Sequence, residues 1–352
     1  MDLNVQKKCG SCSRVFKSDE DFLVNTFRWR LCNRGNLWLN CECGSTLFLE
    51  KDTFPWYSSD LGMSEEAKSL FNSLNPKESL PYVPFELMNI HQALENEVGN
   101  ISQLAKLVKR DPIFSLEIIS TYEGLRRCQN KKLSLDSKNV LEYALTFLGL
   151  QHIQELLLLA MVKQFEIDTR VFSTEEFWHH SKLTGEISVL LADFLTFDDS
   201  FSRNLIYIIG RCCDIGKLVG AMIHPEKIDE IQNTVNDCNN PMTWEVAEIA
   251  VGYSDHSILG EVGAVLWGFP TYVSEAIRFH HNPPSAKIEV HNRELCHLMC
   301  LADAVAHWVD LEPHRMNESR VDEGCQYFNI TRKELDTFVE KITKTLAENP
   351  SE

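Results

Sequence analysis

Helical spacing of apolar residues, sustained from residue 80 to the C-terminus, constrains the fold of this 352-residue chain more than any other feature. In segments 101–108 and 140–148, apolar residues recur every three or four positions, which is the spacing of one buried helix face. Near the end of the chain, Thr331 and Glu334 form a capping-box pair ahead of an amphipathic stretch. Sustained strand alternation does not occur after residue 80. The sequence therefore predicts a mainly all-α protein.

The first fifty residues differ from the rest in their cysteines. Twelve cysteines occur in the chain, and five of them precede Lys51: Cys9, Cys12, Cys32, Cys41 and Cys43. The first two form a Cys-x2-Cys pair and the last two a Cys-x-Cys-Gly pair, and four thiolates from two such pairs suit tetrahedral zinc. The residues between the pairs alternate in part between apolar and polar, as strands do.

A segment of this length cannot bury enough apolar surface to fold without a metal or a disulfide. We therefore predict a small β-rich zinc ribbon over residues 1–52, with zinc bound by Cys9, Cys12, Cys41 and Cys43. Because the second pair is one residue shorter than the usual spacing, Cys32 is the alternative ligand. The competing interpretation is that these are free, buried cysteines, as we expect for the other seven.

Residues 53–79 are richer in Ser, Asn, Pro and acidic residues, which predicts a linker with one short helix near Ser64–Leu74. The helical body after it is expected to divide into two packed halves near Asp168–Ser173. A cleft at that junction is expected to be lined by the histidines at 180, 256, 280 and 281.

Charge and hydropathy limit the classes of function. The net charge of −17 argues against a broad nucleic-acid-binding surface, because such affinity comes from Lys and Arg that neutralise phosphates. Any nucleic-acid contact would be local, for example through the roughly neutral N-terminal segment. No apolar run approaches the length that spans a bilayer, and the first residues do not resemble a secretory signal. A cysteine-rich chain of this kind is expected in the reducing cytoplasm.

Residues 208–219 read Ile-Ile-Gly-Arg-Cys-Cys-Asp-Ile-Gly-Lys-Leu-Val. This segment resembles the Gly-Leu-Leu-His-Asp-Ile-Gly-Lys core of the HD superfamily, with Cys213 where the histidine belongs. In that superfamily the His-Asp dyad supplies adjacent ligands to a metal that activates water. A thiol in place of the imidazole argues against hydrolysis. The same residues also suit an ordinary buried helix followed by a turn.

Other segments extend the resemblance. Phe-Trp-His-His-Ser lies at 177–181, Asp-His-Ser-Ile-Leu-Gly at 255–260, Ile-Arg-Phe-His-His at 277–281 and Leu-Ala-Asp-Ala at 301–304; Leu-Pro-Tyr-Val-Pro at 80–84 and Leu-Val-Lys-Arg-Asp-Pro at 107–112 precede them. Together they resemble an HDOD domain, the HD-related output domain of bacterial signalling proteins, over residues 80–314. The resemblance implies an N-terminal helical bundle (80–168) packed on a degenerate HD-like half (173–314), followed by a C-terminal extension (315–352).

The resemblance also implies a degenerate site, which consists of His180, Cys213, Asp214, His256, His280, His281 and Asp303. The chain lacks a Gly-Tyr-Pro element and has Asn282 where a glutamate commonly follows the paired histidines. We therefore expect a non-catalytic regulatory protein that binds a protein partner of a signalling pathway or a small anionic ligand. A second metal at this remnant is not expected, since loss of a ligand lowers affinity, although Cys213 could itself coordinate zinc.

Two alternatives remain open. The first is a metal-dependent phosphohydrolase that acts on a nucleotide or cyclic dinucleotide through the same residues. The second is a nucleic-acid-associated regulator that uses the zinc ribbon. Histidines on helices are more often packing residues than ligands, so the site prediction rests on the resemblance and not on residue type alone.

Overall fold

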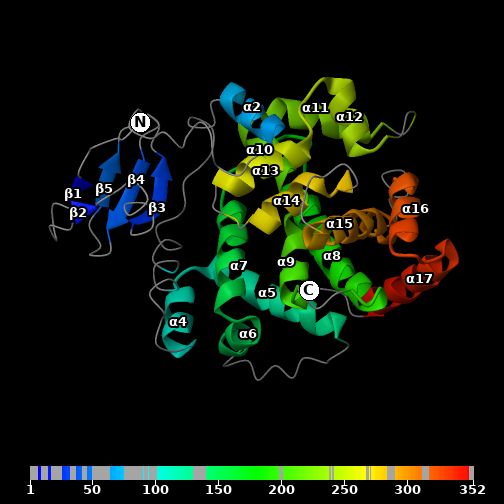
Figure 1. Ribbon diagram of the computed structural model, residues 1–352, viewed down its shortest axis with the longest axis horizontal. Coiled ribbons are helices and arrows are strands. Elements are labelled where there is room, and N and C mark those ends of the chain that lie inside the picture. Colours follow the sequence, from blue (N-terminus) through cyan, green and yellow to red (C-terminus); the bar gives the residue numbers. More distant parts are fainter. Residues whose placement is uncertain are drawn as a thin grey trace.

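The computed structural model describes the backbone of residues 7–8, 15–16, 26–31, 37–41, 46–49, 64–74, 90, 94, 101–129, 140–197, 201–237, 239, 242–266, 269, 271–283, 290–310 and 317–348. Helices dominate it (Figure 1), as the periodicity predicts. Their bounds are α2 (Glu65–Leu74), α4 (Ile101–Val108), α5 (Pro112–Cys128), α6 (Val140–Leu148), α7 (Leu150–Lys163), α8 (Thr174–Phe194), α9 (Arg203–Cys212), α10 (Ile215–Ile223), α11 (Pro225–Val235), α12 (Trp244–Val251), α13 (His256–Leu266), α14 (Thr271–Phe279), α15 (Val290–Val309), α16 (Glu318–Tyr327) and α17 (Arg332–Glu348).

The described part of the first fifty residues is made of short antiparallel strands. β1 (Lys7–Lys8) pairs with β2 (Val15–Phe16), and β3 (Thr26–Leu31), β4 (Leu37–Cys41) and β5 (Thr46–Leu49) form a three-stranded sheet in that order. Thr26 stands opposite Cys41 in the register. The other four candidate zinc ligands, Cys9, Cys12, Cys32 and Cys43, lie outside the described residues, as does the Cys41 side chain. The zinc site therefore stays a prediction.

Local sequence signals fix the helix ends in the first helical half. Asp111 caps α5, because its carboxylate accepts a hydrogen bond of 2.8 Å from the backbone N–H of Phe114, and Pro112 occupies the first turn. Gly149 has a φ of +79°, a conformation that favours glycine, and it separates α6 from α7. These two points follow the ends of the helical segments 101–108 and 140–148 that the apolar spacing predicts.

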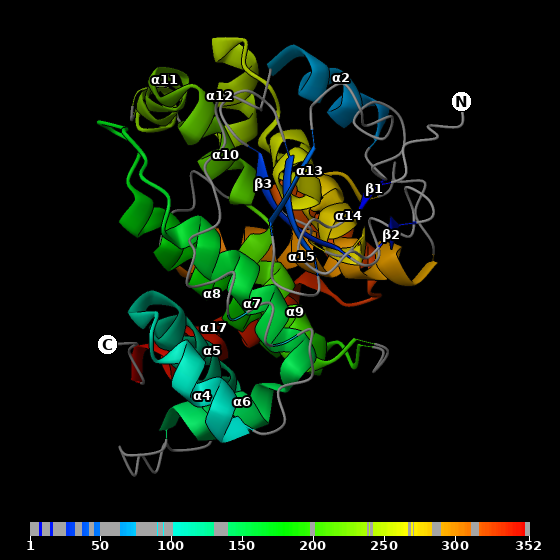
Figure 2. The same cartoon turned by 90° about the vertical axis from the view of Figure 1, so that its left-hand side faces the viewer.

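The two predicted halves share one apolar core. A continuous cluster of buried side chains runs from α4 through α5 and α7 into α8, α9 and α15. Figure 2 shows α7, α8 and α9 running past one another in the middle of the molecule. Across the same boundary, buried Arg211 of α9 forms an ion pair with Glu117 of α5, which also accepts from Lys163 of α7 at 2.6 Å. The halves are therefore joined by packing and by charge.

Helices α10 and α13 approach so closely that their backbones touch. A Cβ atom built on Gly216 would lie 1.7 Å from the carbonyl oxygen of His256 and 2.5 Å from the backbone nitrogen of Gly260. Only glycine permits this approach. The contact fixes the start of α10, beside Asp214, against the start of α13.

The short helix of the predicted linker is docked on the helical body. Ser64, just before α2, donates from Oγ to Glu261 of α13 at 2.7 Å, and its backbone N–H also reaches the Glu261 carboxylate. Ala67 of α2 is fully buried. The segment that the sequence predicts as a linker is thus, over residues 64–70, part of the packed surface of the helical domain.

The C-terminal helices pack against α15, at the right of Figure 1. The predicted capping box is confirmed: the backbone N–H of Thr331 donates to Glu334 at 2.8 Å, and the backbone N–H of Glu334 donates to the Thr331 hydroxyl at 3.3 Å. Among the helices described, none is both long enough and apolar enough to cross a membrane.

Candidate functional site

Asp214 stands at the centre of a cluster that several helices build. It occupies the turn between α9 and α10 and is almost fully buried. Its Oδ1 lies 3.1 Å from His256 Nε2 at the start of α13 and 3.6 Å from His280 Nε2 just after α14. Its Oδ2 lies 3.7 Å from His180 Nε2 of α8. The structure thus brings together residues that the sequence separates by up to a hundred positions.

Asp303 of α15 adds a second carboxylate to this cluster. Its Oδ1 lies 3.1 Å from His180 Nε2. His307, one turn further along α15, stacks on His180 with a ring-centroid distance of 4.2 Å. Burial and the neighbouring Asp214 raise the pKa of Asp303, but the hydrogen bond from His180 and the charge of His307 outweigh them and leave that pKa below its usual value. Asp303 is therefore a carboxylate held by imidazoles.

His256 is fully buried and is held from both ring nitrogens. Its Nδ1 and its backbone N–H both lie 3.0 Å from Glu248 Oε1 of α12, while its Nε2 lies 2.7 Å from His281 Nε2. Burial lowers the pKa of His256, but the carboxylates of Glu248 and Asp214 raise it to about 10. Burial and the charge of His280 hold the pKa of His281 well below its usual value. His256 is therefore the donor in the contact between the two imidazoles.

Cys213 occupies the position of the missing dyad histidine, and its thiol faces the helix backbone. The Sγ donates to the carbonyl of Ile209 at 3.4 Å. Burial and the charges of Asp303 and Asp214 raise the pKa of the thiol well above 9. Within the part of the chain that the structure describes, Cys213 belongs to none of the groups whose possible metal-ligating atoms all lie within 4.8 Å of one another. A neutral thiol of this kind is a poor metal ligand, because the thiolate is the coordinating form.

Two basic residues that sequence reasoning did not assign to the site contact its carboxylates. Lys217 Nζ lies 2.7 Å from Asp214 Oδ2 and 5.0 Å from the centroid of the Trp244 ring. Burial raises the pKa of Asp214, but Lys217, His256 and His280 together bring it well below its usual value. Lys217 follows Asp214 by one helical turn, and that spacing is the signal that could have identified it.

The second of these basic residues comes from the C-terminal extension. Arg320 of α16 forms an ion pair with Glu245 of α12, and its Nη1 lies 3.9 Å from Asp303 Oδ2. Arg320 lies beyond residue 314, the last residue of the HDOD resemblance, and no local motif marks it. The extension therefore contributes to the charge of the cluster.

A cavity of about 540 Å³ opens onto one side of this cluster. Phe172 and Ser173, at the expected junction of the halves, line it together with His180, Asp214 and Lys217. Of the four histidines expected to line this cleft, only His180 lines the cavity. The expectation is wrong for His256 and His280, which are fully buried, and for His281. His281 borders a separate space of about 10 Å³ beside Arg320, which is the size of one water molecule.

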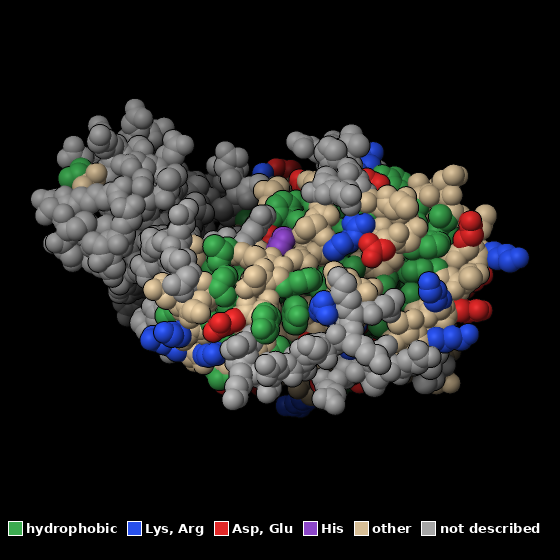
Figure 3. Space-filling view, turned by 90° about the horizontal axis from the view of Figure 1, so that it is seen from below, with side chains coloured by type: hydrophobic (Ala, Val, Ile, Leu, Met, Phe, Trp, Pro, Cys, Tyr) green, Lys and Arg blue, Asp and Glu red, His purple; other side chains and the backbone are tan. Residues whose placement is uncertain are grey.

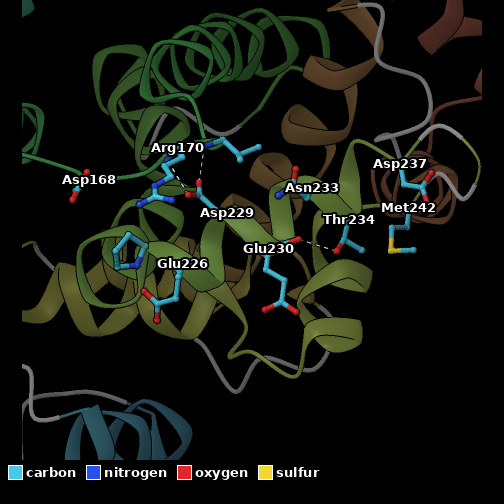
Figure 4. A pocket seen from close by; sticks show the side chains of 11 residues that line it. Asp168, Arg170, Glu226, Asp229, Glu230, Asn233, Thr234, Asp237 and Met242 are labelled. Carbon is cyan, nitrogen blue, oxygen red and sulfur yellow. Dashed lines mark hydrogen bonds between the residues drawn. The ribbon is translucent and has the colours of Figure 1, made fainter.

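A second and larger cavity, of about 940 Å³, is lined by Asp168, Arg170 and Val171 of the junction segment and by residues of α11 (Figure 4). Asp229 of α11 projects toward that segment. Its carboxylate accepts three backbone N–H bonds, from Arg170 at 2.8 Å, Val171 at 2.8 Å and Phe172 at 2.9 Å. Although burial raises the pKa of Asp229, these bonds lower it below its usual value. Asp229 thereby holds the junction segment, of which Arg170 and Val171 line this cavity and Phe172 lines the 540 Å³ cavity.

The donor set around Asp214 fits a metal by residue type. Asp214, His256, His280 and His281 offer ligand atoms that all lie within 4.8 Å of one another, and one carboxylate with three imidazoles suits a borderline divalent ion such as zinc. The buried Nε2 of His280 and Nδ1 of His281 have no hydrogen-bond partner among the residues that the structure describes. His256, by contrast, would have to lose a proton before it could bind a metal.

Comparisons with known proteins identify the family of the helical domain. The HDOD domain family matches residues 80–283. An uncharacterized protein of Treponema pallidum (strain Nichols) is 26% identical over 212 residues, which are 60% of this chain and 39% of that protein. The chain thus spans about two-fifths of the length of this relative.

Solved structures share the fold. An HDOD domain protein of unknown function from Geobacter sulfurreducens has 19% identity and a TM-score of 0.50, over 68% of this chain and 75% of its own. A protein of Shewanella amazonensis SB2B, provisionally named a phosphohydrolase, has 19% identity and a TM-score of 0.54, over 80% of this chain and 95% of its own. A protein of Marinobacter aquaeolei VT8, provisionally named a signal transduction protein, has 17% identity and a TM-score of 0.53, over 89% of this chain and 75% of its own.

Proposed function

This chain belongs to the HDOD family, and from that membership and the site geometry we propose that it is a regulatory signal-transduction protein that binds a partner without catalysing a reaction. The observation that carries the proposal is the buried thiol of Cys213, which stands where the HD core has the histidine of its His-Asp dyad. The thiol donates to the backbone carbonyl of Ile209 at 3.4 Å and offers no imidazole to a metal. Lys217 also pairs with Asp214 at 2.7 Å, but the HD core has a lysine at the same position, so this ion pair does not distinguish the two functions.

The 540 Å³ cavity is the surface that we assign to the partner. Its walls combine the aromatic rings of Phe172, Phe177 and Trp244 with the carboxylates of Glu175, Glu176 and Asp310. Lys217 also lines it but is already paired with Asp214. An apolar or basic side chain of a protein partner fits these walls better than the small anionic ligand that the sequence suggests, because carboxylates at the rim repel anions.

A metal-dependent phosphohydrolase is the second candidate, and the four-residue group around Asp214 favours it. Asp214, His256, His280 and His281 would hold the ion, which supplies water activation when bound. The provisional name of the Shewanella amazonensis protein concerns that protein. The thiol of Cys213 weighs against the same activity in this chain.

The N-terminal segment is proposed to be a zinc ribbon bound by Cys9, Cys12, Cys41 and Cys43, with Cys32 as the alternative ligand. The antiparallel pairing of β3 and β4 between the two cysteine pairs supports this proposal. A nucleic-acid-binding role for the ribbon and a cytoplasmic location stay predictions from the sequence.

Hydrolysis assays on the full chain distinguish the two functions of the helical domain. The protein is incubated with Mn²⁺ or Zn²⁺ and with bis(p-nitrophenyl) phosphate or a cyclic dinucleotide. We expect the same background rate for the wild type as for Asp214→Ala and Asp303→Ala. Turnover by the wild type that disappears in both variants would establish the phosphohydrolase and refute the regulatory proposal.

Site-specific photocrosslinking in the native cell tests the binding surface. A photoreactive residue at exposed Glu176, on the cavity rim, is compared with one at exposed Glu340 on α17. We expect a protein adduct from position 176 that is absent at position 340 and is lost when Trp244→Ala is added. An adduct that forms equally at both positions, or that survives Trp244→Ala, would contradict a partner in this cavity.

A further inference from the structure

Ser202, His152 and Glu155 form a hydrogen-bonded chain on the face of the molecule formed by α7, the start of α9 and α14, separate from the Asp214 cluster. The Ser202 Oγ lies 2.9 Å from His152 Nε2, and His152 Nδ1 lies 2.9 Å from Glu155 Oε2. We propose that Ser202 is an activated nucleophile that hydrolyses small acyl esters, with His152 as its general base and Glu155 as the residue that orients His152. This activity is independent of the partner-binding function proposed above.

Glu155, the last residue of this series of hydrogen bonds, has a rigidly held carboxylate. His152 and Glu155 are one turn apart on α7, which places both side chains on one face of that helix. Glu155 is 3% exposed, and its second oxygen accepts a hydrogen bond of 2.7 Å from the hydroxyl of Tyr272 on α14. Each carboxylate oxygen therefore has a partner, so the group cannot rotate away from His152.

These contacts fix the protons in the arrangement that nucleophilic catalysis needs. A carboxylate only accepts hydrogen bonds, so the bond to Glu155 places a proton on His152 Nδ1. The Nε2 lone pair then accepts the Ser202 O–H. The base is thus hydrogen-bonded to the nucleophile and oriented by a third group, which is the arrangement of serine hydrolases on many unrelated folds.

The position of Ser202 at a helix N-terminus adds to this arrangement. Ser202 is the N-cap of the ten-residue helix α9, and its Oγ already accepts a hydrogen bond of 3.1 Å from the backbone N–H of Leu205. The hydroxyl proton is therefore left for His152. Negative charge that develops beside Ser202 would lie at the positive end of α9, which stabilises an oxyanion.

The surroundings indicate the substrate class. Ser202 is exposed, and His152 retains a side-chain exposure of 13%. The ring of Phe201, which precedes Ser202 in the sequence, lies 6.4 Å from that of Tyr272, whose hydroxyl contacts Glu155. An open serine with apolar neighbours fits a short apolar acyl group on a good leaving group, and not a large substrate that needs a deep pocket.

The reaction needs only water as a co-reactant. Ser202 Oγ attacks the ester carbonyl carbon while its proton passes to His152 Nε2. The bond from carbon to the leaving oxygen then breaks, and the leaving alcohol or phenol takes that proton. A water molecule attacks the acyl-serine with His152 again as the base, so the carboxylic acid leaves and the Ser202 hydroxyl is restored.

The test uses the full chain, a fluorophosphonate probe and p-nitrophenyl acetate. The labelled serine is identified by peptide mass spectrometry. Ser173 is the matched control, because it is also an N-cap serine, accepting from Glu176 N–H at 3.2 Å, and its described hydrogen bonds involve no histidine. We expect at least about tenfold more labelling at Ser202 than at Ser173, from the contribution of a general base.

Variants then separate catalysis from folding. Ser202→Asn removes the nucleophile but keeps an N-cap acceptor, and His152→Gln removes the base. We expect each to lower ester hydrolysis about a hundredfold, with unchanged thermal unfolding as the control. Labelling of Ser202 that equals that of Ser173 in the wild type would refute the proposal, and so would Ser202 labelling that persists in a folded His152→Gln variant.

Discussion

Replacement of Gly216 by alanine tests whether the backbone contact between α10 and α13 holds the site together. The added Cβ would lie 1.7 Å from the His256 carbonyl oxygen, where ordinary contacts begin at 3.4 Å, so the helices would have to separate by about 1.7 Å. The obstacle is backbone, and no side-chain rotation can relieve it. Overpacking of a core costs about 1–3 kcal/mol, and a rigid backbone clash belongs at the upper end or beyond.

Gly220→Ala is the matched control on the same helix. The nearest atoms to its Cβ are the side-chain carbons of Ile228, at 2.8 Å and 3.3 Å, which can move by rotation. Alanine in a helix is also favoured over glycine by about 1 kcal/mol, which offsets the adjustment. We expect Gly216→Ala to lower the free energy of unfolding by about 3 kcal/mol or more, and Gly220→Ala to stay within about 1 kcal/mol of the wild type.

Thermal and urea unfolding, followed by circular dichroism, measure both variants. The expected loss in Gly216→Ala corresponds to a Tm lower by about 6 °C or more for a domain of this size. If Gly216→Ala has the same Tm and the same free energy of unfolding as Gly220→Ala, the close approach of α10 and α13 does not exist as described. The placement of Asp214 beside His256 would then lose its physical basis.

Three further predictions concern other parts of the chain. Arg211 and Lys163 lower the pKa of fully buried Glu117 to about 2 despite its burial. A carboxyl group with a depressed pKa stabilises the fold above its unfolded pKa of about 4.5, and this stabilisation is lost as the pH falls toward 2. In urea titrations, Glu117→Gln should therefore lower the free energy of unfolding by about 3 kcal/mol at pH 7 and by progressively less below pH 4.5. A difference from the wild type that does not change with pH would contradict this. Cys41→Ser should lower the zinc content of the purified protein, measured by mass spectrometry of the metal, below about one equivalent per chain. If Cys32→Ser lowers the zinc content instead, Cys32 is the ligand. A wild-type protein that contains no zinc would refute the ribbon. Asp229→Ala removes the acceptor of three backbone N–H groups and should accelerate proteolysis within residues 170–172, while Glu230→Ala on the same helix should not; equal cleavage rates would show that Asp229 does not fix the junction.

Several features of this protein are local and were therefore available from the sequence. The cap of Asp111 on α5, the break at Gly149 and the capping box of Thr331 and Glu334 depend on residues at most four positions apart. Apolar spacing fixes a helix face in the same way, because one turn of helix repeats every 3.6 residues. The motifs around Asp214 also predicted the family, since their order along the chain is itself a sequence property.

Tertiary packing decided what the motifs could not. Ser64 reaches Glu261 across 197 positions, and His152 reaches Ser202 across 50. The full burial of His256 and His280 and the approach of Arg320 to Asp303 depend on which helices pack side by side. The sequence alone thus determined the helices, their ends and the residue types near Asp214. Only the tertiary structure decided which charges neutralise one another and which side chains face a cavity, because those properties arise from distances between helices that no local pattern encodes.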